Sequence, residues 1–262
     1  MDLVVERKVD WEGDRMVDDS APRIPELQAL MSRVATDANV QGLVLTGSWA
    51  RGMATEHSDV DVFVVLQHQQ GWVTTRTKEI DLPAVTLEQL QSVPGDPTHW
   101  WDRYSFVDAR VLLDRTGGFL TPMIDAWANL SRDEVRRCLD TYLDGYINFV
   151  YRSLKAERDA RPLEQRLDAV ESINWMLWLV FALFARVRPY NQYLRHELAR
   201  RPLDPPGWRD VDLVGHLESI MDTGVAAAQR DIYRLIERSA RELGHGPTID
   251  AWGDDLVLIR GR

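Results

Sequence analysis

One stretch, from Gly42 to Leu66, limits what this chain can fold into, because two apolar runs in it each meet a polar cluster. A first run of three aliphatic residues, 43–45, ends at Gly47-Ser48. An apolar run that stops at such a pair is typical of a buried strand that ends in a turn. The second run extends from residue 60 to residue 66. We therefore expect two strands, with a polar connection between them.

Two carboxylates, Asp59 and Asp61, stand at the start of the second run. Alternate side chains of a strand share a face, so these two point the same way. The opposite face is expected to carry Val60, Val62, Val64 and Leu66. Neighbouring carboxylates repel each other unless a cation lies between them. Because Mg²⁺ is usually held by one or two carboxylates together with substrate phosphates, the pair predicts a metal site.

The Gly47-Ser48 turn offers the groups that a phosphate needs. A glycine lets backbone N–H groups approach a ligand closely, and the serine adds one hydroxyl. Ser48 lies eleven residues before Asp59. The same stretch therefore predicts a phosphate-binding turn beside a metal-binding pair.

These residues resemble a known signature. Gly47-Ser48 with Arg51-Gly52, followed by Ser58-Asp59-Val60-Asp61-Val62, is similar to the motif of the DNA polymerase β-like nucleotidyltransferase superfamily. Its small-molecule members, such as aminoglycoside nucleotidyltransferases, and its minimal members are the most similar branches. The resemblance is specific over residues 47–61 and loose elsewhere.

The resemblance implies an enzyme that moves a nucleoside monophosphate, AMP from ATP or the equivalent from another NTP, onto a hydroxyl of a small acceptor with release of pyrophosphate. It implies Mg²⁺ as the cofactor and nucleotide contacts from Gly47, Ser48, Arg51 and Ser58. It also implies that Asp59 and Asp61 act with a third acid on a neighbouring strand. His57, next to the pair, is more often a loop residue than a site residue in such a position.

Three residues are candidates for the third acid. Asp81 is preferred as a catalytic and metal-binding residue, because it lies between apolar neighbours in Ile-Asp-Leu, ahead of a short helix. Asp108 shares its expected strand face with Arg110, so an exposed ion pair between the two would also explain an aspartate at this position. Asp114 precedes Arg-Thr-Gly-Gly and has the position of a turn-starting aspartate.

The pattern of the chain changes near residue 131. Before it, strand-like and helix-like segments alternate, which predicts a mixed sheet with flanking helices. Ser131 and Glu134 form a capping box that opens a long helix, and a second, apolar helix is expected at 163–186. We therefore predict an α+β protein with a nucleotidyltransferase domain that binds NTP and Mg²⁺ at 1–130, and a helical substrate-binding domain at 131–262.

Four further expectations concern single elements. Residues 25–39 are expected to form a helix, and Thr86 is expected to cap a short one. Residues 104–114 are interpreted as a strand whose one face carries Val107, Ala109, Val111 and Leu113. The tail from residue 251 to residue 260 is interpreted as an extended edge.

The helical half has a resemblance of its own. The run from Arg186 to Leu194, Arg-Val-Arg-Pro-Tyr-Asn-Gln-Tyr-Leu, is similar to substrate-domain helices of bacterial small-molecule nucleotidyltransferases. Those helices often carry a lysine where Gln192 stands, so no phosphate contact is transferred to that position. Arg188 and Lys155 are expected as nucleotide-phosphate ligands, with Arg152 as a further candidate, although cations on helix surfaces are usually only solvated.

Charge and composition bear on partners and location. The net charge is −10, and no run of five Lys or Arg residues occurs. An acidic protein favours cationic small molecules over long polyanions, so nucleic acid is not expected as a partner. A single cysteine, Cys138, and the absence of a signal-like start or a membrane-length apolar run favour a cytoplasmic protein. The sequence leaves the oligomeric state open.

Two other functions compete with the leading one. A toxin-type nucleotidyltransferase would modify tRNA or a protein side chain, and a basic groove would favour it. A catalytically inactive nucleotide-binding module would keep the fold without the chemistry. The complete set of Gly47, Ser48, Asp59 and Asp61 argues against inactivity.

Overall fold

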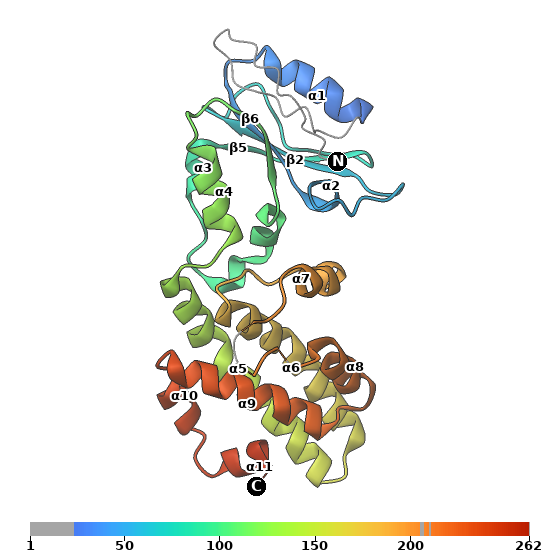
Figure 1. The fold of residues 1–262 in the computed structure, drawn as a ribbon, viewed down its shortest axis with the longest axis vertical. Helices are drawn as coiled ribbons and strands as arrows, with labels where there is room; N and C mark the ends of the chain where they lie inside the picture. The colour runs from blue at the N-terminus through green and yellow to red at the C-terminus, as the bar shows by residue number, and fades with distance from the viewer. Residues whose placement is uncertain (1–23, 205–206, 210, 262) are drawn as a thin grey trace, which may run out of the picture. The chain divides into compact units, whose positions relative to one another are not determined.

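The computed structural model describes residues 24–204, 207–209 and 211–261. The described residues form two compact units. Residues 24–93 and 105–126 make up the first, here called the sheet unit, and residues 94–104 and 127–261 the second, here called the helical unit (Figure 1). Residues 94–104, before the boundary expected at residue 130, thus belong with the helices.

The sheet unit is built on a mixed sheet. Its strands are β1 (Val40–Leu45), β2 (Val60–Leu66), β3 (Thr75–Arg76), β4 (Ile80–Leu82), β5 (Ala84–Thr86) and β6 (Arg110–Asp114). Their order is β3-β4-β2-β1-β6, with β5 beside β2. β1 is antiparallel to β2 and β6, whereas β4 and β5 run parallel to β2. The predicted α+β class with a mixed sheet is confirmed.

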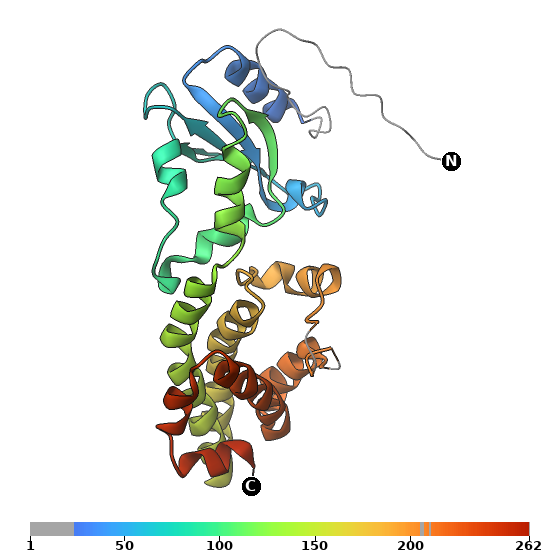
Figure 2. The same ribbon diagram turned by 60° about the vertical axis from the view of Figure 1, so that its left-hand side comes forward.

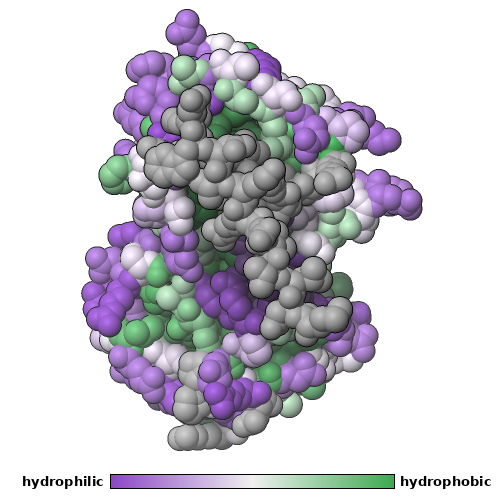
Figure 3. Space-filling view, turned by 45° about the horizontal axis from the view of Figure 1, so that its top comes forward, coloured by the Kyte–Doolittle hydropathy of each residue, from purple (hydrophilic) through white to green (hydrophobic). Residues whose placement is uncertain are grey.

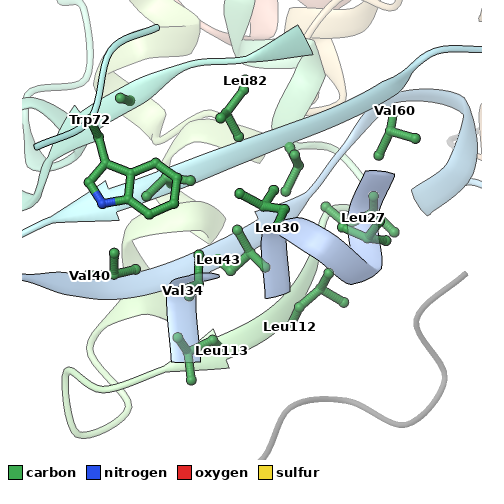
Figure 4. Close-up of a cluster of buried hydrophobic side chains, with 14 of the residues drawn as sticks. Leu27, Leu30, Val34, Val40, Leu43, Val60, Trp72, Leu82, Leu112 and Leu113 are labelled. Atoms are coloured by element: carbon green, nitrogen blue, oxygen red, sulfur yellow. The ribbon is translucent and has the colours of Figure 1, made fainter. Parts of the chain in front are cut away.

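One face of the sheet is covered by α1 (Pro25–Ala35), which begins at a proline as expected. Leu27, Leu30 and Val34 of this helix are buried against the sheet (Figure 4). From β2, this core takes the residues that the alternation predicts: Val60, Val62, Val64 and Leu66. The prediction for this strand is therefore confirmed, and Asp61 belongs to the other face.

The sheet unit also contains the described helices α2 (Gly47–Ala50) and α3 (Leu87–Gln91) and all but the last two residues of α4 (Leu120–Ala128). The capping box that opens α3 is present, because the Thr86 hydroxyl accepts from the Gln89 amide and the Gln89 side chain accepts from the Thr86 amide. α4 packs closely on β1, since a Cβ added to Gly42 would lie 2.5 Å from Leu120 Cδ2.

The strand expected at 104–114 is shorter than predicted. Residues Trp101–Phe106 form a 3₁₀ helix, and Asp108 adopts a left-handed backbone with φ 60°. Only Arg110–Asp114 pairs with β1, and a bulge interrupts that pairing. The bulge shifts the alternation, so Leu112 and Leu113 are both buried in the core on the α1 side. The expected common face of Val107, Ala109, Val111 and Leu113 was therefore wrong.

The helical unit is dominated by two long helices. α5 (Arg132–Arg158) begins with the predicted capping box of Ser131 and Glu134, and α6 is Pro162–Leu183. They lie side by side (Figure 2), so closely that a Cβ on Gly145 would meet the Trp175 ring at 2.4 Å. The remaining elements are η1 (Pro97–His99), η3 (Asn191–Tyr193), α7 (Leu194–Arg200), α8 (Leu213–Thr223), α9 (Ala226–Glu242), α10 (Gly246–Asp250) and α11 (Asp255–Arg260).

The tail is helical, which corrects the expectation of an extended edge at 251–260. Leu256 and Ile259 are buried three residues apart, a spacing that places them on one side of α11. Among the described residues, no helix is long and apolar enough to cross a membrane. On the face of the molecule in Figure 3, hydrophilic residues are interspersed with smaller hydrophobic areas.

Candidate functional site

The Gly47 turn and the start of β2 are joined by the backbone. The Thr46 amide donates to the Asp61 carbonyl oxygen at 2.8 Å, and the Thr46 hydroxyl donates to the same oxygen at 3.3 Å. Gly47 follows with φ +64°, and a Cβ built there would lie 1.9 Å from Asp61 Oδ2. Only glycine fits at this position, both for its backbone conformation and for the space that the carboxylate occupies.

The turn also exposes donors. Within α2, the Ala50 amide donates to the Thr46 carbonyl and the Arg51 amide to the Gly47 carbonyl. The amides that precede them, of Gly47 and Ser48, have no partner within a helix of this kind. The Ser48 hydroxyl has no hydrogen-bond partner among the residues that the structure describes. The predicted phosphate-binding groups are therefore available next to Asp61.

Three carboxylates gather at this end of the sheet. Asp61 of β2 and Asp81 of β4 are direct register partners in the parallel pair, and Asp59 precedes β2 by one residue. Burial, followed by the negative charges of Asp59 and Asp81, raises the pKa of Asp61 to about 6. The positive charges of Arg51 and Arg76 oppose this rise in pKa. A bound cation would relieve the repulsion between these half-buried carboxylates.

The three candidates for the third acid lie in different places. Asp81 is beside Asp61, and Arg76 Nε approaches its Oδ2 at 3.5 Å. Asp114 lies at the other end of the sheet, because it pairs with Gly42 at the start of β1. There it accepts bonds from the Thr116 amide and hydroxyl at 2.7 and 2.6 Å, as a turn-starting aspartate does. Asp108 lies in the loop before β6. The geometry thus favours Asp81.

The residues present fit a divalent cation that substrate phosphates help to hold. Among the described residues, no three Asp, Glu, His or Cys side chains are assembled to bind a metal ion by themselves. Mg²⁺ does not need such an assembly, since it keeps waters and is commonly bound by one or two carboxylates plus phosphate oxygens. Asp59 and Asp61, next to the donors of the Gly47 turn, supply that arrangement.

Two predicted nucleotide contacts have structural roles. Arg51 is buried, and its Nη2 donates to the Val107 carbonyl at 3.0 Å, which ties α2 to the loop before β6. The Ser58 hydroxyl accepts from the Thr55 amide at 2.9 Å and closes the loop ahead of Asp59. His57 is an exposed loop residue, as expected from its position in the sequence, and its Nε2 lies 3.6 Å from Glu56 Oε1.

The other predicted contacts lie in the helical unit. Lys155 is exposed in the last turn of α5, with its Nζ 5.9 Å from the Tyr151 ring centroid. Arg152 pairs with Asp168 at 3.2 Å. Arg188, by contrast, is buried. A role in nucleotide binding stays a prediction for Lys155 and Arg188.

Sequence reasoning missed two residues of the site. Thr46 holds the turn to Asp61 through its amide and hydroxyl, and Arg76 faces Asp81 across the β3–β4 pair. A two-residue strand such as β3 has no periodicity to detect. Thr46 could have been found as the residue between the end of a buried strand and a glycine with a special backbone conformation.

One comparison, with a protein-family model, supports the interpretation of the sheet unit as nucleotide-binding. Residues 27–94 match the family model of the nucleotidyltransferase domain, a segment that contains the Gly47 turn, both aspartates of the pair and Asp81. The predicted resemblance is confirmed for this segment, and the match indicates nucleotidyl transfer as its general chemistry.

Solved structures also show similarity. A nucleotidyltransferase-like protein from Exiguobacterium sibiricum 255-15 is 14% identical, with a TM-score of 0.44. The similarity covers 90% of this chain and 79% of the other. No curated protein matches the chain.

Proposed function

We propose that the sheet unit binds a nucleoside triphosphate, with ATP as the expected donor, through Mg²⁺ on Asp59 and Asp61. The protein then transfers the nucleoside monophosphate to a hydroxyl of a small acceptor. The observation that carries this proposal is the Asp61 carboxylate, crowded by Asp59 and Asp81 and lying against the Gly47 turn. The match of residues 27–94 to a nucleotidyltransferase domain supports the same chemistry.

Each residue of the site has a distinct part in this reaction. Asp59 and Asp61 hold the cation, which neutralises phosphate charge and orients the α-phosphate when it is bound. The amides of Gly47 and Ser48 and the Ser48 hydroxyl donate to phosphate oxygens. Asp81, the register partner of Asp61, acts as the third acid and accepts the proton of the acceptor hydroxyl.

The chemical step is an in-line substitution at the α-phosphorus. The hydroxyl oxygen of the acceptor bonds to that phosphorus while the bond to the oxygen of the β-phosphate breaks, and pyrophosphate leaves. Positioning of the two reactants accounts for much of such a rate enhancement. Arg51 and Ser58 support the step indirectly, because they hold the loops on either side of the site.

A small acceptor is favoured over tRNA by charge. The net charge of −10 disfavours a long polyanion, and a protein that neutralises six or more phosphates loses affinity by ~10³ or more between ~50 and ~200 mM salt. We expect negligible tRNA binding at physiological salt.

The test uses ATP labelled at the α-phosphate, with Mg²⁺, a mixture of small hydroxyl compounds and, separately, total tRNA. The wild-type protein should release pyrophosphate and label a small compound, and Asp61→Asn should do neither. Label on RNA would replace the small-molecule function by the toxin-type one. Wild-type protein that binds ATP without releasing pyrophosphate in either mixture would identify an inactive binding module.

A further inference from the structure

Arg188 is a buried cation with few partners. It lies five residues after the end of α6 and is 7% exposed. Nη2 donates to Asn191 Oδ1 at 3.1 Å, whereas Nε is buried with no hydrogen-bond acceptor among the described residues. A guanidinium has five N–H donors, so the described residues use only part of its capacity for hydrogen bonding.

Two tryptophan rings flank this guanidinium. Its central carbon lies 5.8 Å from the Trp101 ring centroid and 5.5 Å from that of Trp178. Trp178 is buried and stacked on Tyr142 at 5.5 Å, so it forms a fixed wall. Trp101 is 52% exposed and packs on Tyr190 at 4.7 Å. The guanidinium therefore lies close to two rings, one of them buried and the other reached by solvent.

Two other arginines of the helical unit, Arg103 with a fully buried side chain and Arg186 with one that is 11% exposed, have a carboxylate partner. Arg103 pairs with Glu134 and Arg186 with Glu197, each at 2.6 Å. Arg188 pairs with no carboxylate in the part of the chain that the structure describes. Burial lowers the pKa of Arg188, but a guanidinium stays charged at neutral pH. Contacts with aromatic rings offset only part of the cost of burying an unpaired charge.

We propose that the helical unit contains an oxyanion-binding site in which Arg188, flanked by Trp101 and Trp178, binds a carboxylate or phosphate group. The planar guanidinium suits such groups because it can donate two parallel hydrogen bonds to them. The exposed Trp101 ring adds a flat surface for the part of the ligand that carries the anion. Either the nucleotide or an acidic group of the acceptor could supply the anion, and only this choice of source rests on the proposed function.

The existence of the site is tested with the whole protein and inorganic phosphate in EDTA. Without a metal ion, the carboxylates of the sheet unit repel phosphate, so binding reports on sites that need no cation. Tryptophan fluorescence and calorimetry should show saturable binding to the wild type. Arg188→Gln should weaken it by about tenfold or more, and Arg188→Lys, which keeps the charge without the planar fork, by less.

A matched control removes an ordinary surface cation. Arg136 is exposed on α5 and lies 3.4 Å from Asp133, so Arg136→Gln changes the net charge equally and should leave phosphate binding unchanged. Circular dichroism and thermal melting would establish that each variant is folded. Phosphate binding that is absent in the wild type, or equally strong in folded Arg188→Gln, would overturn the site and leave Arg188 as a core residue held by its aromatic contacts.

The source of the anion is tested with ATP and Mg²⁺. If the site binds the nucleotide phosphates, Arg188→Gln should weaken MgATP binding by about tenfold or more as well. If it binds an acidic acceptor, MgATP binding should stay unchanged while phosphate binding is lost. Failure of the proposed function looks different: the wild type would then bind phosphate through Arg188 but would not bind MgATP.

Discussion

At the scale of single residues, the site depends on how closely Gly47 and Asp61 approach each other. The carboxylate occupies the space that any side chain at residue 47 would need, and Gly47 also has a left-handed backbone. The same closeness brings the amides of the turn beside a carboxylate whose neighbours, Asp59 and Asp81, raise its pKa. A phosphate group that accepts from these amides and a cation held by the carboxylates can therefore bind next to each other.

Gly47→Ala should abolish nucleotidyl transfer and destabilise the protein. A left-handed alanine costs about 1–2 kcal/mol, and the overlap with Asp61 adds about 1–3 kcal/mol. Gly52 is the matched control: its φ is +69°, but an added Cβ would meet no atom of the described residues within 4 Å. Gly52→Ala should show only the backbone cost in urea unfolding. Equal losses of stability in both variants would show that the contact with Asp61 does not matter.

The raised pKa of Asp61 predicts a dependence of stability on pH in the metal-free protein. The folded-state pKa of about 6 lies above the ordinary value of 3.8, so the folded protein binds the proton more tightly than the unfolded chain. This contribution to stability is fully present below pH 3.8 and is lost as pH rises through about 6.

Asp61→Asn removes that dependence. After a discount for partial exposure, the metal-free variant should be about 1–2 kcal/mol more stable than the wild type above pH 6 and nearly equal to it near pH 4. Urea unfolding in EDTA at several pH values measures the difference. A variant that is less stable than the wild type at every pH would contradict the repulsion between the three carboxylates.

At the scale of elements, the sequence predicts those whose signals are local. Alternation in β2 and the capping boxes of α3 and α5 depend on residues a few positions apart, and the structure contains all three. The failures depend on distant contacts. The bulge in β6 is set by its pairing with β1, and α11 is helical where Leu256 and Ile259 become buried. Neither cause is visible in a short window of sequence.

Glu134 illustrates how a local signal can have a second role. It completes the capping box at Ser131 and also pairs with Arg103, whose side chain is fully buried. Glu134→Gln keeps a hydrogen-bonding side chain but leaves the buried cation without its counter-charge, so stability should fall by about 2–4 kcal/mol. The matched control is Asp133→Asn, because Asp133 is exposed and only weakly paired with Arg136. Urea unfolding of both variants measures the contrast, and equal effects would contradict a special role for the buried pair.

At the scale of the whole molecule, the residues proposed for the sheet unit's site are close together in the sequence, whereas the surroundings of Arg188 are not. Gly47, Ser48, Asp59 and Asp61 are close in sequence, and β4 brings Asp81 beside them through one strand pairing. The surroundings of Arg188 include the ring of Trp101, which lies before the helical half in the sequence but belongs to the same compact unit. These surroundings could not be predicted, because only the fold brings them together.

If carboxylates of the sheet unit hold the nucleotide through a divalent cation, as we propose, ATP should stabilise the protein only when that cation is present. The thermal stability of the protein with ATP, measured with Mg²⁺ and with EDTA, tests this claim. At a hundredfold excess of ATP over its dissociation constant, Mg²⁺ and ATP together should add ~2.7 kcal/mol to the free energy of unfolding, and most of this should disappear in EDTA or in Asp61→Asn. An equal stabilisation by ATP in EDTA, or in Asp61→Asn with Mg²⁺, would contradict the claim.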